Sequence, residues 1–315
     1  MSHPTFKSLI ALTLALVLAG CVPSAPETLS LKVVATNTVL ADLARNVGGE
    51  LVSVTSLVPA GADIHTFQTT PSNSITIGAA DLIISNDGGL DDFMTPVLTS
   101  AQRPGSVHIV ASTGLVATEI VELESTKEDA VVAEEAERSN GDERPAGEPD
   151  PHFWLNPTLA IHYVERILEG LTEADPNNAQ QYTDNAQAYI EQLRQLDLEI
   201  ANTLNQVPLE RRHLVTFHDA YGYFARHYEW KISAFVPGDA SDVTPGDIVT
   251  VMEQIKLDGI PAVFAEPQLN SDVLRQAAQD AGVEVGIIRS LVDDQTRTYI
   301  EMMRANAKSL VEKLG

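Results

Sequence analysis

The chain has 315 residues, with 20 Lys and Arg against 44 Asp and Glu, so its formal net charge is −24. This charge argues against nucleic acid as a partner, because phosphate binding requires clustered basic side chains. A hydrophobic fraction of 44% predicts a folded chain with a real core, and the single cysteine excludes a disulfide framework and any zinc site built from several thiolates.

The first 21 residues predict a signal peptide of the lipoprotein type. One lysine precedes the apolar run of residues 9–18, which is too short for a membrane-spanning helix of about 20 residues. Small residues directly before Cys21 resemble the lipobox of bacterial lipoproteins, in which the cysteine becomes the first residue and carries lipid. We therefore expect an extracytoplasmic protein anchored through Cys21, with residues 22–30 as a tether. An ordinary signal peptide is the alternative.

Strand and helix patterns alternate from residue 31 onward. The expected segments are strands at 31–36, 51–58, 82–85 and 107–110, and helices at 38–47 and 71–80. This alternation predicts βαβ units and a parallel sheet. We therefore expect residues 31–174 to form an N-terminal α/β lobe.

An acidic stretch, residues 116–150, interrupts this lobe. From Glu119 to Asp150 there are twelve acidic and three basic residues, with no aromatic residue and no histidine. A segment so charged and so poor in apolar residues cannot bury a core. The composition predicts a solvated, mobile insertion.

A long helix is predicted at 175–207. No proline or glycine interrupts residues 177–207, and apolar or aromatic side chains recur at steps of three and four, which is the period of one helical face. The residues of this face are Tyr182, Ala186, Tyr189, Leu193, Leu196, Ile200 and Leu204. About 31 helical residues would extend roughly 46 Å, enough to cross a small protein.

A second α/β set follows this helix and defines a C-terminal lobe, residues 208–315. The expected segments are strands at 213–217, 231–235, 262–265 and 283–288, and a final helix at 299–314. The predicted architecture is therefore two α/β lobes, each with a mainly parallel four-stranded sheet and flanking helices, joined by one long rigid helix.

Three histidines lie at the ends of predicted elements. His65 follows the second strand, His152 precedes the helix that begins near Pro157, and His218 follows the strand 213–217. Ligands of open α/β sheets gather at the carboxyl ends of the strands. Neutral imidazole is the commonest metal ligand and suits zinc, so these residues are candidate ligands.

Several motifs carry a resemblance to a known family. They are VVATNTVLADLARNVGG, GADIHTFQTTPS, DPHFWLNP, TFHDAYGYFARHY, FAEPQ and the ending TYIEMMRANAKSLVEKL. Over residues 31–315 the sequence resembles the solute-binding lipoproteins of zinc- and manganese-uptake ABC transporters. The resemblance implies two lobes joined by a rigid helix, with His65, His152 and His218 as metal ligands.

The sequence departs from this family at the position of a fourth ligand. Many members have a carboxylate in an Asp-Ser-Leu or Asp-Pro-Leu context, where this chain has Arg289-Ser290-Leu291. Because a cation cannot coordinate a metal, Asp293, Asp294, Glu266 and water remain as alternatives. Zinc-type members often carry a His-rich acidic loop before the second ligand, whereas the acidic insertion here has no histidine.

The resemblance implies a monomeric binding protein, not an enzyme, that delivers a metal ion to an ABC permease and its ATPase. Three imidazoles favour zinc as the ion, because manganese prefers carboxylate oxygen. Manganese or iron remains the alternative, and cell adhesion is a possible second role. A zinc hydrolase with three histidines and an open water position is a remote alternative, since no residue has a motif that ties it to acid or base catalysis.

Overall fold

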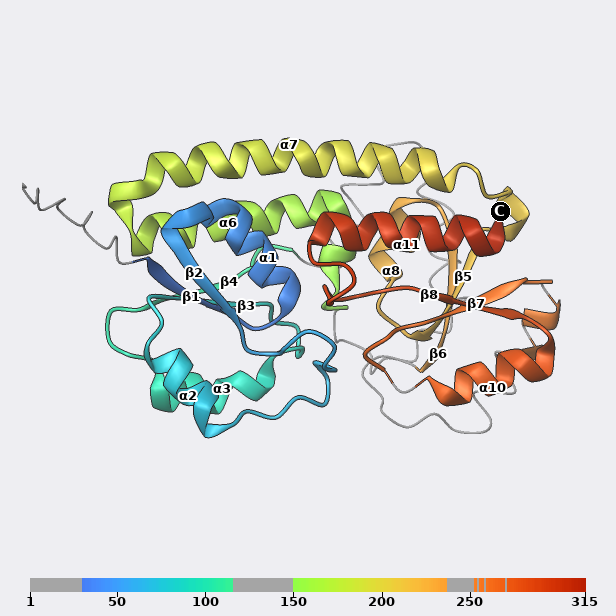
Figure 1. Ribbon diagram of the computed structural model, residues 1–315, viewed down its shortest axis with the longest axis horizontal. Helices are drawn as coiled ribbons and strands as arrows, with labels where there is room; N and C mark the ends of the chain where they lie inside the picture. The colour runs from blue at the N-terminus through green and yellow to red at the C-terminus, as the bar shows by residue number, and fades with distance from the viewer. Residues whose placement is uncertain (1–29, 116–149, 237–251, 254, 258, 270) are drawn as a thin grey trace, which may run out of the picture.

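The computed structural model describes residues 30–115, 150–236, 252–253, 255–257, 259–269 and 271–315 (Figure 1). The predicted signal peptide, nearly all of the tether and nearly all of the acidic insertion lie outside these residues. Among the described helices, none has both the length and the apolar character that crossing a bilayer requires.

The N-terminal lobe is built on a parallel four-stranded sheet with the strand order β2-β1-β3-β4, as the alternating pattern predicted. β2 begins one residue later than expected because Gly49–Leu51 forms a 3-10 turn before it, and it ends two residues earlier than expected, at Ser56. The elements are β1 (Leu31–Ala35), α1 (Thr38–Gly48), β2 (Val52–Ser56), α2 (Pro71–Gly78), β3 (Leu82–Ser85), α3 (Thr95–Ala101) and β4 (Val107–Val110).

The C-terminal lobe repeats this winding with the parallel order β6-β5-β7-β8. In each lobe the first strand of the sheet is an inner strand. The second strand lies on one side of it, and the third and fourth strands lie on the other side. Ligands bind at such switch points, beyond the carboxyl ends of the strands. The elements are β5 (His213–His218), α8 (Gly222–His227), β6 (Lys231–Val236), β7 (Ala262–Ala265), α10 (Asp272–Ala281) and β8 (Glu284–Ile287).

Two long helices and the C-terminal helix cover one side of both lobes. α6 (Pro157–Ala174) leads through a 3-10 turn at Pro176–Asn178 into α7 (Ala179–Leu204), and α11 (Tyr299–Leu314) ends the chain. Figure 1 shows α7 running above both sheets, with α6 and α11 beneath it. All seven residues that we assigned to the apolar face of the long helix are buried. The periodicity therefore identified the face that packs on the lobes.

The lobes are also packed directly against each other. A single cluster of buried apolar side chains extends from Val33 in β1, through α7, to Leu310 in α11. The Thr38 hydroxyl of α1 donates to the carbonyl of Val292 at 2.8 Å. These contacts tie the lobes together beside the carboxyl ends of the strands, where ligands are expected.

Candidate metal centre

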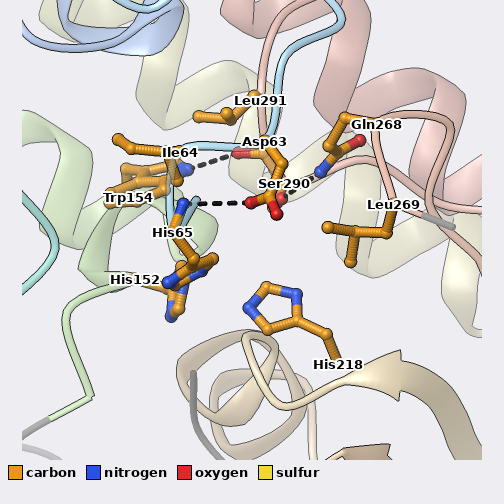
Figure 2. A pocket seen from close by; sticks show the side chains of 10 residues that line it. All are labelled: Asp63, Ile64, His65, His152, Trp154, His218, Gln268, Leu269, Ser290 and Leu291. Carbon is orange, nitrogen blue, oxygen red and sulfur yellow. Dashed lines mark hydrogen bonds between the residues drawn. The ribbon is translucent and has the colours of Figure 1, made fainter. Parts of the chain in front are cut away.

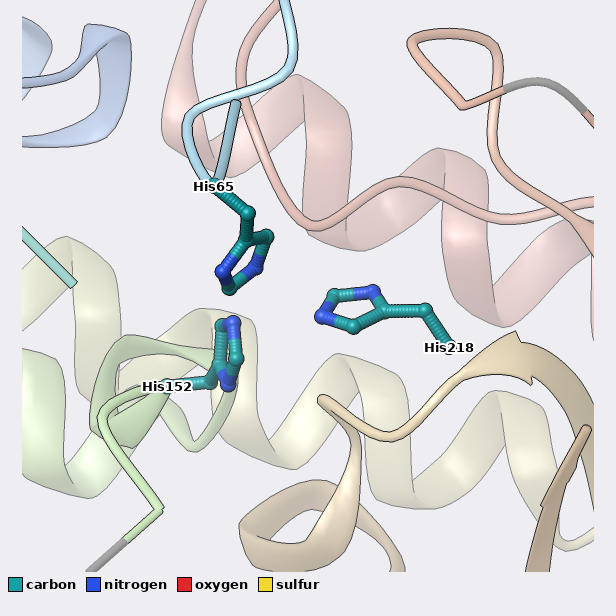
Figure 3. A group of neighbouring side chains, drawn as sticks. All are labelled: His65, His152 and His218. Carbon is teal, nitrogen blue, oxygen red and sulfur yellow. The ribbon is translucent and has the colours of Figure 1, made fainter. Parts of the chain in front are cut away.

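The three predicted histidines converge on one point between the lobes, although they are far apart in sequence. His65 lies in the loop after β2, His152 precedes the 3-10 turn Phe153–Leu155, and His218 is the last residue of β5. Their ring centroids are 5.0 to 5.6 Å apart (Figure 3). One possible ligand atom from each residue lies within 4.8 Å of the others.

Local structure explains how His152 and His218 reach this point. The side chain of Asn156 accepts the N–H of Thr158 and so caps α6, with Pro157 in the first turn. This cap fixes the short turn that follows His152. His218 is placed by the ladder of β5, which is buried inside its sheet. Both imidazoles are almost fully buried, at 3% and 5% exposure, whereas His65 is partly buried.

The histidines face a small pocket that both lobes line (Figure 2). Its walls combine the imidazoles with apolar side chains, neutral polar side chains and one carboxylate. The residues are Asp63, Ile64, His65, His152, Trp154, His218, Gln268, Leu269, Ser290 and Leu291. Such a small and enclosed space suits a single ion rather than an organic substrate.

Each of the three histidines is hydrogen-bonded to a carboxylate. Glu266 Oε1 lies 2.7 Å from Nδ1 of His218, and Asp150 Oδ1 lies 2.8 Å from Nδ1 of His152. Asp63 Oδ1 accepts the backbone N–H of His65 at 3.0 Å. A carboxylate at Nδ1 orients the ring and leaves Nε2 as the atom available to a metal.

His218 shows this arrangement most clearly. Its Nε2 is buried and has no hydrogen-bond partner among the described residues. A buried, unsatisfied imidazole nitrogen is costly in a folded protein, and a metal ion would satisfy it. The donor chemistry of this site therefore fits a transition-metal dication.

Glu266 and His218 form a buried, hydrogen-bonded pair. Burial alone would raise the pKa of Glu266, but the contact with His218 outweighs it and holds that pKa below the usual range. Burial alone would lower the pKa of His218, but the Glu266 carboxylate raises it above the ordinary value. Deprotonation of His218, which metal coordination requires, is therefore less favourable than for an isolated imidazole.

The carboxylates considered as a fourth ligand lie outside the group of clustered ligand atoms. Asp293 accepts from Arg289 Nε at 2.7 Å and from the backbone N–H of Thr296 at 2.7 Å. Glu266 is engaged with His218 and with two further donors, Gln268 and Ser290. Within the described residues, the clustered group of metal-ligating side chains contains the three histidines and none of Glu266, Asp293 or Asp294.

Sequence reasoning missed the role of Asp150. It was counted with the acidic insertion, yet Asp150 Oδ1 accepts both the backbone N–H and the ring Nδ1 of His152. The same spacing occurs at Asp63 and His65. This repeated Asp-x-His pattern was the signal available in the sequence.

The other described histidines are bonded away from the pocket. His213 Nε2 lies 3.0 Å from the Ser233 hydroxyl, and His227 Nε2 lies 2.7 Å from Asp197 Oδ1. The remaining pairs are His108 with Ser85 and His162 with the carbonyl of Thr113. These contacts give the four residues structural roles outside the pocket.

The known proteins that this chain matches are named for metal uptake or metal binding. The family model described as zinc-uptake complex component A, periplasmic, matches residues 33–313. The manganese-binding lipoprotein MntA of Halalkalibacterium halodurans is 30% identical, with 98% of each chain covered. The iron-binding protein YfeA of Yersinia pestis is 29% identical over 90% of this chain and 86% of that protein. Among solved structures, the periplasmic zinc binding protein TroA of Treponema pallidum matches with a TM-score of 0.77 and 28% identity, over 91% of this chain and 99% of its own.

Proposed function

The chain belongs to the zinc-uptake complex component A family, and from this premise we propose that it captures a transition-metal dication outside the cytoplasm and delivers it to an ABC importer. The convergence of three imidazoles from both lobes on one small pocket carries this proposal. Family membership supports a transport role rather than the zinc hydrolase considered from the sequence. The partners are then a permease and its ATPase.

The proposed ligands are His65, His152 and His218, and the proposed ion is zinc. Zinc accepts three imidazoles and a water in a tetrahedral site, whereas manganese prefers carboxylate and carbonyl oxygen. The clustered ligand group supplies nitrogen atoms only. Relatives of this chain are named for manganese, iron and zinc, so family membership alone does not select the ion.

We expect zinc to bind on the order of a hundredfold or more tightly than manganese, because a nitrogen-rich site follows the usual order of affinities for divalent ions. The measurement is a competition titration of metal-free protein, after metal analysis of material purified without added zinc. Retention of manganese in the presence of excess zinc would make manganese the ion and this selection wrong.

The relatives that are named lipoproteins support an anchored, extracytoplasmic protein. We propose that Cys21 carries the lipid and that the folded lobes act as a monomer at the membrane surface. Mass spectrometry of the N-terminal peptide tests the anchor. An unmodified Cys21 within the mature chain would contradict it.

The packing of the lobes predicts little change of shape when the ion is released. α7 lies across both lobes without a proline to bend it, and the lobes share one buried cluster. We expect solution scattering to give nearly equal radii of gyration for metal-free and zinc-loaded protein. A difference of several ångströms would show a wide opening instead, of the kind seen where a flexible hinge joins two lobes.

A further inference from the structure

Trp154 links the two lobes directly behind the candidate metal centre. It lies two residues after His152 and is fully buried. Its indole N–H donates to the carbonyl of Ser290 at 2.7 Å, and its own carbonyl accepts the hydroxyl of Tyr299 at 2.6 Å. Its ring also meets the His152 ring edge to face, with centroids 5.3 Å apart. One residue of the N-terminal lobe is therefore held at both its side chain and its backbone by the C-terminal lobe.

Ser290 continues this connection to the opposite histidine. Its hydroxyl donates to Glu266 Oε2 at 2.5 Å, and Glu266 Oε1 lies 2.7 Å from Nδ1 of His218. The result is an unbroken path from His152 through Trp154, Ser290 and Glu266 to His218. Figure 2 shows Trp154 and Ser290 on the pocket wall beside the histidines.

We propose that Trp154 is a positioning residue, which sets the separation of His152 and His218 before the ion arrives. This inference rests on the proposed function, since it assumes that these histidines hold the metal. Every member of the path is nearly or fully buried, so its hydrogen bonds do not compete with water. A site whose ligands are already correctly positioned avoids the free-energy cost of ordering them when the ion binds.

The indole suits this position for a physical reason. It is a large rigid ring that carries a hydrogen-bond donor at its far end, so it can fill the space between the lobes and also satisfy a buried carbonyl. A phenylalanine would fill much of the same space without the donor. The Ser290 carbonyl would then lose its partner and the lobes would lose this tie, although the core would remain apolar.

The two tryptophans of the chain offer a matched comparison. Trp230 is also buried, at 6% exposure, but its indole N–H has no hydrogen-bond partner among the described residues. Trp154→Phe and Trp230→Phe therefore make the same change in volume, and they differ in the inter-lobe hydrogen bond and in the contact with the His152 ring. We expect Trp154→Phe to weaken zinc binding about tenfold or more, the usual effect of removing a group that orients a ligand. Trp230→Phe should stay within about twofold of the parent.

A second readout separates positioning from general destabilisation. The visible absorption of bound Co²⁺ reports the geometry of its ligands, so Trp154→Phe should change this spectrum and Trp230→Phe should not. Ser290→Ala removes the hydroxyl that holds Glu266 but keeps the carbonyl that accepts from Trp154. It should also weaken zinc binding and change the spectrum, and it carries the test if Trp154→Phe fails to fold.

The double variant Trp154→Phe/Ser290→Ala tests whether the two residues act on one path. Its fold-loss of zinc affinity should be smaller than the product of the two single fold-losses, because the second substitution acts on a path that the first has already interrupted. Fully multiplicative losses would overturn the proposal, as would affinities and Co²⁺ spectra that are the same for the Trp154 and Trp230 variants. A parent protein that binds neither Zn²⁺ nor Co²⁺ would instead refute the proposed function, and the positioning role with it.

Discussion

His218→Ala is expected to weaken zinc binding by at least about a hundredfold, because removal of a ligand should exceed the 10- to 100-fold cost of losing a group that merely orients one. His218 belongs to the histidine cluster, and its buried Nε2 has no hydrogen-bond partner among the described residues. Similar losses are expected for His65→Ala and His152→Ala. Competition against a zinc chelator of known affinity gives the measurement.

Two further histidines serve as controls for this prediction. His213 and His227 flank His218 in sequence but are bonded to Ser233 and Asp197, outside the pocket. His213→Ala and His227→Ala should keep zinc affinity within about twofold of the parent. Parent-like binding by His218→Ala would show that the third ligand is wrongly assigned.

The loss of a ligand must also be separated from a loss of stability. His218→Ala leaves the carboxylate of Glu266 fully buried without its imidazole partner, which is strongly destabilising. The double variant His218→Ala/Glu266→Gln removes that buried charge. It should bind zinc as weakly as the single variant and yet melt at a higher temperature. Recovery of zinc binding in the double variant would mean that the defect came from folding.

The main features of the fold could be predicted from local patterns. The seven apolar positions of α7 repeat with a helical period over 23 residues, and all seven are buried. The alternation of short apolar runs with helices likewise predicted the two parallel sheets. The ends of elements were less accurate, because 3-10 turns such as Gly49–Leu51 and Pro176–Asn178 have no distinct sequence period.

The metal centre was only partly predictable. The positions of His65, His152 and His218 at the ends of elements, together with the family motifs, were enough to expect that they meet. The contacts made by Trp154 and Glu266 were not, because these join residues that are distant in sequence. Trp154 and Ser290 are 136 positions apart, and Glu266 and His218 are 48 apart. Whether Glu266 binds a metal or orients a histidine depends on packing that no local pattern records.

Asp42→Asn is expected to stabilise the metal-free protein near neutral pH by up to about 3 kcal/mol. Asp42 lies on α1 at 4% exposure, and its carboxylate accepts the backbone N–H of Tyr299 at 2.8 Å, at the start of α11. Burial raises the pKa of Asp42 from 3.8 to about 6. The Tyr299 N–H and the positive charge of Arg45 offset burial only in part.

The sign of the pH dependence follows from this shift. Between pH 3.8 and about 6 the folded state keeps the Asp42 proton while the unfolded state has lost it. The free energy of unfolding therefore falls as pH rises through this range, and the whole cost is present above pH 6. At about 1.4 kcal/mol per pKa unit, the shift amounts to about 3 kcal/mol. An asparagine stays neutral throughout and keeps an oxygen that can accept the Tyr299 N–H.

Urea unfolding of the metal-free parent and variant at pH 4.5 and pH 7.5 provides the measurement. The stability difference in favour of Asp42→Asn should be about 2 kcal/mol larger at pH 7.5, since the parent carboxyl is largely protonated at pH 4.5. Asp92→Asn, at an exposed position of the same lobe, is the control variant measured under the same two conditions. If the stability difference between the parent and Asp42→Asn did not change with pH, favourable contacts would fully offset the effect of burial on the Asp42 pKa. The ionised carboxylate would then stabilise the contact between α1 and α11, and the substitution would weaken that contact.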